Sequence, residues 1–225
     1  MFLAIGSPGL DAAGRPVTFP GIDGRPMHGL FLDARDRPAP AVVLVPMLGR
    51  TRDDWDAVAQ RLAEANLNVL AIDLPGTALP GDPAELLRWH EAVTGAVAYL
   101  GSRPDDVRPG AVGVAGASLG ANLTVVAAAA DPAIRSIALV SPSLDYRGVR
   151  IDAPMSEYGS RPALLMASLH DPYAARSVRA LARDAAGVRD VRWSASAAHG
   201  TALLAQDPEL VRALVDWFRL TLVVS

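Results

Sequence analysis

The stretch Gly116-Ala117-Ser118-Leu119-Gly120 lies between a short apolar run, residues 111–115, and an alanine-rich run, residues 121–130. The first run is typical of a buried strand and the second of a helix. A G-x-S-x-G segment between a strand and a helix forms a strained turn that raises one serine hydroxyl above the end of a sheet. The glycines are needed because the tight turn leaves no space for side chains beside the serine. The segment therefore predicts that Ser118 is a nucleophile.

Strand-like and helix-like segments alternate along the rest of the chain. Residues 17–32 predict a hairpin that turns at Asp23-Gly24, and its prolines, Pro20 and Pro26, place its strands at a sheet edge. Thr51 is the predicted N-cap of the first helix because a carboxylate follows three residues later. Further strands are predicted at residues 41–45, 68–74, 136–140, 163–167 and 191–196, and helices at residues 51–65, 84–102, 178–186 and 208–222.

This order of elements predicts an α/β fold with a mostly parallel twisted sheet, an N-terminal antiparallel hairpin and helices on both faces. The chain has 225 residues, of which 51% are hydrophobic, which suits a single domain spanning residues 1–225. We expect no large cap domain. Only residues 143–161 form a stretch long enough for a small lid-like excursion.

The charge and the cysteine count exclude several classes of protein. A net charge of −3 provides no electrostatic footprint for nucleic acid. The chain has no cysteine, so it holds neither a disulfide framework nor a thiolate zinc site. The sequence does not specify the oligomeric state.

Two apolar stretches bear on localisation. Residues 1–6 lack the basic start and the length of a signal peptide, so a cytoplasmic location is expected, with export after removal of a leader as the alternative. Residues 111–130 carry no charge and approach the length of a membrane span. Glycines, Ser118 and Asn122 interrupt this stretch, which favours a buried strand and helix, and we expect no membrane insertion.

A serine nucleophile needs a base within hydrogen-bond reach. In this type of sheet the partners of Ser118 follow it in the order acid, then histidine. Among the four histidines only His199 follows all the predicted strands. His28 falls within the hairpin and His90 within a helix, where structural roles are expected, while His170 lies before the candidate acid. The sequence therefore predicts His199 as the base.

Two aspartates are candidates for the acid that orients this histidine. Asp171 directly follows the predicted strand at residues 163–167, and Asp145 follows the preceding strand. Asp171 is favoured because Asp145 opens a loop of roughly fifteen residues. An aspartate before a turn also caps backbone donors without any chemistry, so both retain that structural interpretation.

The oxyanion of the reaction needs two backbone N–H donors. The first is predicted at Leu119, at the start of the helix after the nucleophile. The second is expected from the loop after residues 41–45. Pro46 has no N–H, which leaves Met47 or Leu48, and Leu48 is slightly preferred by its position.

These motifs together resemble those of small, cap-poor α/β-hydrolases near the dienelactone-hydrolase-like esterases. The resemblance covers nearly the whole chain and implies a triad of Ser118, Asp171 and His199 that forms an acyl-enzyme, without metal or organic cofactor. Two departures stand out: Pro46-Met47 replaces the His-Gly that usually begins the oxyanion loop, and dienelactone hydrolase itself uses cysteine where this chain has serine. The motifs are residues 42–49, Asp73-Leu74-Pro75-Gly76, Gly116-Ala117-Ser118-Leu119-Gly120, His170-Asp171-Pro172 and Ala198-His199-Gly200.

The implied function is a serine carboxylesterase acting on short- to medium-chain esters, with a small-molecule ester as its only expected partner. Met155, Tyr158 and Tyr173 are candidates for an apolar substrate pocket. Arg50 and Arg52 are interpreted as solvated charges beside neighbouring aspartates, with attraction of an anionic substrate as the alternative. A lactone or dienelactone hydrolase, an amidase or peptidase and an acyltransferase share the same triad. A non-catalytic hydrolase-like binding protein is the alternative from another class.

Overall fold

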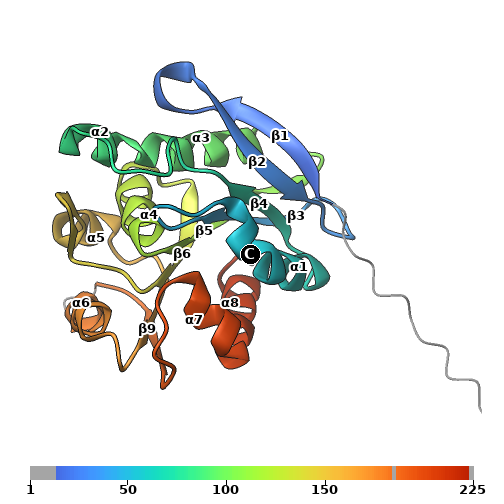
Figure 1. Ribbon diagram of the computed structural model, residues 1–225. Helices are drawn as coiled ribbons and strands as arrows, with labels where there is room; N and C mark the ends of the chain where they lie inside the picture. The colour runs from blue at the N-terminus through green and yellow to red at the C-terminus, as the bar shows by residue number, and fades with distance from the viewer. Residues whose placement is uncertain (1–13, 184–185, 223–225) are drawn as a thin grey trace, which may run out of the picture.

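Eight strands form the central sheet of the computed structural model, which describes residues 14–183 and 186–222 (Figure 1). They are β1 (Arg15–Pro20), β2 (Pro26–Leu32), β3 (Ala39–Val45), β4 (Asn68–Ile72), β5 (Val107–Ala117), β6 (Ile134–Val140), β9 (Ala163–Ser168) and β10 (Arg189–Ser194). Their order across the sheet is β1-β2-β4-β3-β5-β6-β9-β10. The pairs β1–β2 and β2–β4 are antiparallel, and all the others are parallel. The predicted mostly parallel sheet with an N-terminal antiparallel hairpin is confirmed.

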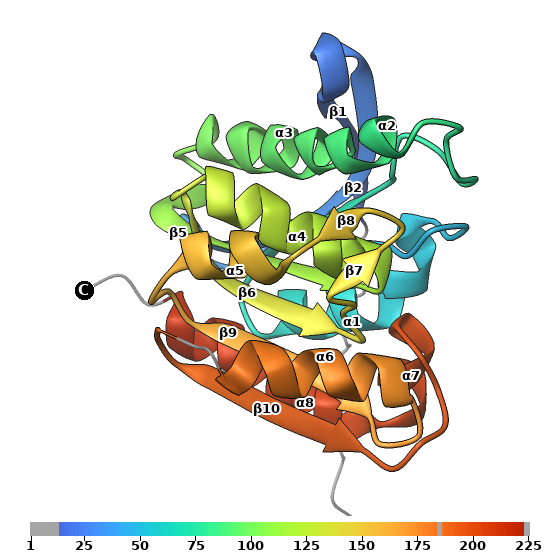
Figure 2. The same cartoon turned by 90° about the vertical axis from the view of Figure 1, so that its left-hand side faces the viewer.

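Helices cover both faces of this sheet. One face carries α3 (His90–Gly101), α4 (Leu119–Ala130), α5 (Asp152–Tyr158) and α6 (Pro172–Arg183), and the other carries α1 (Asp56–Glu64), α7 (Thr201–Gln206) and α8 (Pro208–Thr221) (Figures 1 and 2). The sequence of strand β3 is continuously apolar because both of its faces are covered. Val43 and Val45 pack into the core under α3 and α4, whereas Val42 and Leu44 pack into the core under α1 and α8.

Several elements differ from the sequence-based predictions. The helix expected at residues 84–102 is two helices, α2 (Pro83–Arg88) and α3, because Asp82 caps the first at Ala84 N–H and a turn at Trp89 separates them. The helix expected at residues 51–65 begins as the 3-10 segment η2 (Arg52–Trp55). Thr51 occupies the predicted N-cap position with an extended backbone, but its side chain makes no capping hydrogen bond. Helix α6 begins six residues before the predicted start, and α7 was not predicted.

The N-terminal hairpin turns through the 3-10 segment η1 (Ile22–Gly24). Strand β1 lies at the sheet edge, as predicted, but β2 is an inner strand. Its pairing with β4 covers only Gly29 to Leu32. Pro26 lies outside that paired part, so its missing N–H removes no bond from the β2–β4 ladder.

Residues 111–130 divide between β5 and α4, as expected for a buried strand followed by a buried helix. Within the described residues no helix is long and apolar enough to cross a membrane. Residues 143–161 form a short hairpin, β7 (Asp145–Tyr146) and β8 (Val149–Arg150), followed by α5. Met155 and Tyr158 anchor α5 in the core, and Figure 2 shows the helix lying beside α4.

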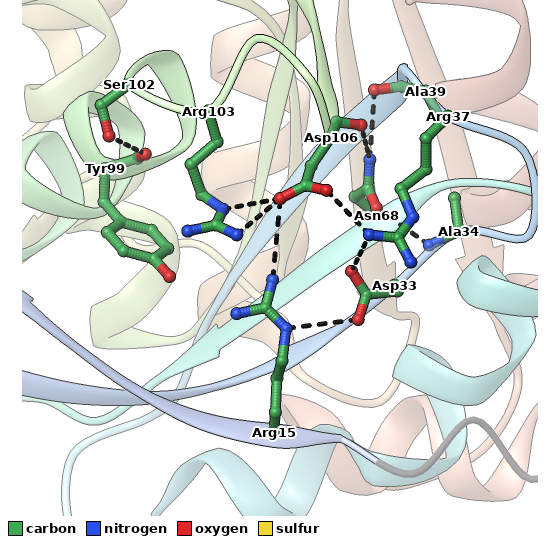
Figure 3. A network of polar contacts seen from close by, with 10 residues as sticks. All are labelled: Arg15, Asp33, Ala34, Arg37, Ala39, Asn68, Tyr99, Ser102, Arg103 and Asp106. Atoms are coloured by element: carbon green, nitrogen blue, oxygen red, sulfur yellow. Dashed lines mark hydrogen bonds and ion pairs between the residues drawn. The ribbon is translucent and has the colours of Figure 1, made fainter.

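The amino-terminal edge of the parallel strands is held by a network around Asp106 (Figure 3). Its carboxylate accepts hydrogen bonds from Arg37 at 2.8 Å and from Arg103 at 3.0 Å. Asn68, fully buried at the start of β4, donates to the Asp106 carbonyl at 2.7 Å and accepts from Ala34 N–H at 2.9 Å. The network therefore joins the ends of the hairpin to the starts of β3, β4 and β5.

Replacing Asp106 with asparagine should make stability less dependent on acid pH. The hydrogen bond from Arg37 is the main cause that holds the pKa of Asp106 below its ordinary value; burial opposes it and Arg103 adds to it. A lowered folded-state pKa stabilises the protein above the unfolded-state pKa, and this stability is lost as pH falls through the folded-state value. As the pH is lowered from about 5 to about 2, the difference in the free energy of unfolding between the wild type and Asp106→Asn should shrink, as measured by chemical denaturation. Asp105→Asn, at the neighbouring exposed residue, is the control, and a difference that stays constant with pH would contradict the prediction.

Candidate active site

The predicted turn between β5 and α4 has the geometry that its glycines require. Ser118 adopts φ 51° and ψ −118°, a strained conformation for a residue with a side chain. A Cβ on Gly116 would lie 2.2 Å from the Gly120 carbonyl oxygen, and a Cβ on Gly120 would lie 2.4 Å from the Val45 carbonyl oxygen. The Ser118 N–H donates to the Val140 carbonyl at 2.9 Å. These contacts fix Ser118 at the carboxyl end of β5.

The structure brings Ser118, His199 and Asp171 together in one chain of hydrogen bonds. His199 Nε2 lies 2.9 Å from Ser118 Oγ, and His199 Nδ1 lies 2.6 Å from Asp171 Oδ2. A carboxylate only accepts hydrogen bonds, so in the neutral imidazole Nδ1 carries the proton and donates to Asp171. Nε2 is then left to accept the Ser118 hydroxyl proton. This is the arrangement that a general base requires.

Asp171 makes two different interactions through its two oxygens. Oδ2 accepts from His199, while Oδ1 accepts from the Ala174 N–H at 3.0 Å in the first turn of α6. The helix-capping contact and the contact to the imidazole therefore coexist. Together they fix the plane of the carboxylate.

The other candidates lie in local structural contacts. Asp145 Oδ1 accepts from Gly148 N–H at 2.8 Å and closes the β7–β8 turn. His90 Nδ1 lies 2.8 Å from the Leu87 carbonyl at the start of α3. His28 lies on β2, where its Nδ1 is 3.4 Å from Thr18 Oγ1. Among the predicted acids and bases, the geometry connects only Asp171 and His199 to Ser118 in the described chain.

The loop after β3 lies against the start of α4. A Cβ on Gly120 would lie 2.5 Å from the Pro46 carbonyl oxygen, so the two backbones are in direct contact. In the part of the chain that the structure describes, the backbone N–H groups of Met47, Leu48 and Leu119 donate to no other residue. All three predicted oxyanion donors are therefore available, and Met47 and Leu48 remain alternatives.

The residues predicted for the substrate pocket separate into two groups. The Tyr158 hydroxyl donates to the Pro162 carbonyl at 2.7 Å, and Arg161, which lies over its ring, donates to the Ile134 carbonyl. Tyr158 therefore lies at the amino ends of β6 and β9, at the edge of the sheet opposite Ser118. The pocket assignment of Tyr158 needs correction, because its side chain is 1% exposed and belongs to the core.

Met155 belongs to the same core cluster, and burial against it explains the apolar side chain. Tyr173 is different. It lies in the first turn of α6, two residues from Asp171, and is 57% exposed. Of the three predicted pocket residues, Tyr173 alone stands beside the site.

Arg50 and Arg52 both pair with carboxylates. Arg50 Nε lies 3.3 Å from Asp54, and Arg52 forms a short ion pair with Asp73, which also accepts the Arg52 N–H at 3.1 Å. Arg50 therefore pairs with a neighbouring aspartate, as expected. Arg52 instead pairs chiefly with Asp73, which directly follows β4. Neither guanidinium presents an uncompensated charge to a substrate.

One residue of this region was missed by sequence reasoning. Ser141, directly after β6, is 1% exposed, and its Oγ accepts from the Gly200 N–H at 3.0 Å, next to His199. A serine at the end of a predicted strand is a common feature, so the sequence carries little signal for this contact. In the described residues no group of three or more histidine, aspartate or glutamate side chains is arranged to hold a metal ion.

The model of the Alpha/beta hydrolase family matches residues 42–224. The chain belongs to this family. The match begins within β3 and includes Ser118, Asp171 and His199. None of the curated proteins matches this chain.

Solved structures of the same fold cover almost all of this alpha/beta hydrolase at low sequence identity. An esterase from Pyrococcus furiosus is 14% identical with a TM-score of 0.77, covering 99% of this chain and 96% of that one. Dienelactone hydrolase from Anabaena variabilis is 18% identical with a TM-score of 0.71, covering 94% and 100%. DcsB, solved in complex with its substrate analogue, is 15% identical with a TM-score of 0.78, covering 93% and 99%. At these identities the similarity shows the fold.

Proposed function

We propose that this alpha/beta hydrolase is a serine carboxylesterase that acts on short- to medium-chain carboxylic esters. The observation that carries the proposal is the hydrogen-bonded chain from Ser118 Oγ through His199 to Asp171 at the strained turn. A structural serine needs neither an imidazole at 2.9 Å nor a backbone held at φ 51°. Strain of this kind persists where the surrounding structure enforces it, and it concentrates at active sites.

In the first half of the reaction, Ser118 Oγ forms a bond to the acyl carbon while His199 Nε2 takes its proton. The charge moves to the carbonyl oxygen, where the N–H of Leu119 and that of Met47 or Leu48 donate to it. His199 then gives its proton to the alcohol oxygen as the ester C–O bond breaks. The alcohol leaves, and the acyl group remains on Ser118.

In the second half, water repeats the attack. His199 takes a proton from the water as its oxygen bonds to the acyl carbon, and the Ser118 Oγ–acyl bond breaks as His199 returns the proton to Ser118. Asp171 keeps the proton of the neutral imidazole on Nδ1 and stabilises the imidazolium in both halves. The products are an alcohol and a carboxylic acid.

Arg50 and Arg52 give the site no preference for anionic esters, because both are already paired with carboxylates. The exposed Tyr173 ring beside Asp171 offers an apolar surface for the acyl or alcohol group. The Pyrococcus furiosus protein of the same fold is described as an esterase, which supports an ester as the substrate class.

A series of p-nitrophenyl esters from acetate to palmitate tests the proposal. We expect kcat/KM to peak at short chains and a fluorophosphonate to attach once, on the peptide that contains Ser118. Equal rates on neutral and carboxylate-bearing esters would further show that the arginines do not select substrate. Inertness toward every ester, together with absence of labelling, would reject the esterase and favour a binding protein.

Related assays with other substrates separate the remaining functions that share the triad. Faster cleavage of anilides than of matched esters would indicate an amidase. Transesterification that outcompetes hydrolysis in the presence of an alcohol would indicate an acyltransferase. A preference for cyclic over open esters would indicate a lactone hydrolase.

Asp171→Asn should lower kcat by roughly 10⁴-fold while Asp145→Asn leaves it unchanged. An asparagine amide at position 171 donates as readily as it accepts, so it no longer fixes the Nδ1–H tautomer of His199. Steady-state kinetics on p-nitrophenyl acetate measure both variants. Equal losses in the two variants would remove Asp171 from the proposed triad.

A further inference from the structure

Strand β10 has one free edge in the described chain. The sheet ends at β10, which pairs with β9 and with no other described strand, and Figure 2 shows it along the lower margin of the molecule. The Ala163 N–H donates to the Val188 carbonyl at 3.0 Å, and the Leu169 N–H donates to the Ser194 carbonyl at 2.9 Å. In a parallel pair alternate residues face the neighbour. The even-numbered residues of β10 therefore bond to β9, and Arg189, Val191 and Trp193 direct their N–H and C=O groups outward.

These outward groups determine the registers in which β10 of one copy of the chain can pair with β10 of a second copy. Antiparallel pairing about a two-fold axis needs outward residues opposite one another. Centring the axis on Val191 pairs Val191 with itself and Arg189 with Trp193, all of which are outward residues. The same register sets Asp190 of each copy opposite Arg192 of the other.

The neighbouring registers are repulsive. Centring the axis on Asp190 sets two carboxylates opposite each other, and centring it on Arg192 sets two guanidinium groups opposite each other. Like charges directly opposite destabilise a strand pair, and opposite charges stabilise it. Asp190 and Arg192 already pair within one chain at 2.7 Å. In the Val191-centred register each of these carboxylates gains a second guanidinium, so backbone direction and charge select the same register.

Exposed apolar side chains gather beside this edge. Trp193 is 37% exposed, Val188 is 65% exposed, and Leu220 of α8 is 74% exposed. Leu220 lines a groove between β10 and α8 together with Asp190 and Arg192. On the other face of the sheet, the guanidinium of Arg179 in α6 lies over the Trp193 ring, 5.1 Å from its centroid. A polar strand edge with apolar groups on its flank is suited to a second copy of the same surface.

We propose that two copies of this chain associate through antiparallel β10–β10 pairing centred on Val191. The pairing joins two eight-stranded sheets into one continuous sheet. Val191 lies outside the proposed triad and oxyanion donors, so association is independent of the proposed esterase function.

Val191→Pro tests the backbone part of the proposal. The Val191 N–H faces away from β9, so proline removes a bond between copies without removing one within the chain. Analytical ultracentrifugation over micromolar concentrations should show twice the monomer mass for the wild type and the monomer mass for Val191→Pro. A wild-type monomer at every concentration, or a dimer that survives in Val191→Pro, would overturn the proposal.

Charge exchange tests the register. Asp190→Arg alone and Arg192→Asp alone place like charges opposite each other and should each weaken the dimer at least tenfold. The double variant Asp190→Arg/Arg192→Asp restores opposite charges and should recover the dimer. The double variant also keeps an opposite-charge pair within each chain, as in the wild type. Failure of the double variant to dimerise would therefore reject the register.

We also infer, on the basis of the proposed function, that Ser141 is a positioning residue for His199. Its backbone has φ 51°, its N–H donates to the Met166 carbonyl at 2.8 Å, and its Oγ accepts from the Gly200 N–H. It follows β6, between the strands that carry Ser118 and Asp171. A buried hydroxyl in a strained conformation thus holds the backbone next to His199.

Paired substitutions separate positioning from packing. Ser141→Ala and Ser141→Gly both remove the acceptor, but only glycine relieves the backbone strain. Both should lower kcat and the rate of fluorophosphonate labelling at least tenfold with KM unchanged, while Ser141→Gly melts at a higher temperature than Ser141→Ala. Wild-type kcat in Ser141→Gly would overturn the inference. An inert, unlabelled wild type would instead reject the esterase function itself.

Discussion

Ser118→Ala should lower kcat for ester hydrolysis by roughly 10⁶-fold and leave Tm within about 2 °C of the wild type. The substitution removes the only atom that forms the acyl-enzyme and retains the oxyanion donors at Leu119 and in the loop after β3. Serine and alanine carry the same Cβ at φ 51°, so the backbone strain is unchanged. His199 keeps its hydrogen bond to Asp171. Stopped assays on p-nitrophenyl acetate and thermal melts measure the two quantities side by side.

A second variant at position 118 tests whether the backbone conformation that activity requires lowers the stability of the protein. Ser118→Gly also lacks the nucleophile but relieves the strain at φ 51°. It should therefore be inactive and more stable than Ser118→Ala by about 1 kcal/mol. Residual turnover above a thousandth of the wild-type rate in both variants would overturn the assignment of Ser118.

Gly116→Ala should prevent the chain from reaching a stable fold, at a cost of more than about 4 kcal/mol. The new methyl group would lie 2.2 Å from the Gly120 carbonyl oxygen and 2.5 Å from Thr124 Oγ1. Neither group is free to move, because Thr124 Oγ1 donates to that same carbonyl at 2.8 Å inside α4. Relief would require α4 to shift away from β5. Urea denaturation followed by circular dichroism measures the loss.

Gly101→Ala is the matched control for this prediction. Gly101 is the last residue of α3, and a Cβ there would meet no atom within 4 Å. Alanine favours a helix over glycine, so this variant should equal or exceed wild-type stability by up to about 1 kcal/mol. Similar unfolding midpoints for Gly116→Ala and the wild type would show that the turn tolerates a side chain.

Most of the sheet was predictable because its parallel strands are buried on both faces. Continuous apolar runs such as residues 41–45 then have few alternatives. The errors occur where tertiary contacts decide the structure. Helix α5 carries Pro154 and polar residues and is anchored by Met155 and Tyr158 in the core. Helix α7 is a short segment of six residues, and the sequence pattern alone did not separate it from the neighbouring loop.

The candidate site was predictable where local chemistry is specific. The two glycines around Ser118 define a turn that few other sequences need, and His199 is the one histidine after the last strand. The choice between Asp171 and Asp145 was less constrained, since both follow a strand and both make turn contacts. The pocket prediction for Tyr158 failed because an aromatic residue in a sequence gives no indication of which end of the sheet it occupies. Ser141 depends on a contact across 59 residues, and nothing local marks it.

The two contacts of Asp171 make the proposed enzyme depend on the local stability of one surface helix. Its carboxylate is planar, so the oxygen that caps α6 and the oxygen that holds His199 turn together. Helix termini open at lower free energy than the core. When the first turn of α6 frays on heating, the carboxylate loses its anchor and the imidazole loses its orientation while the sheet is still folded. Activity should therefore be lost at temperatures below the global melting temperature. Pro172, at the first position of α6, limits the fraying and so raises the temperature at which activity is lost.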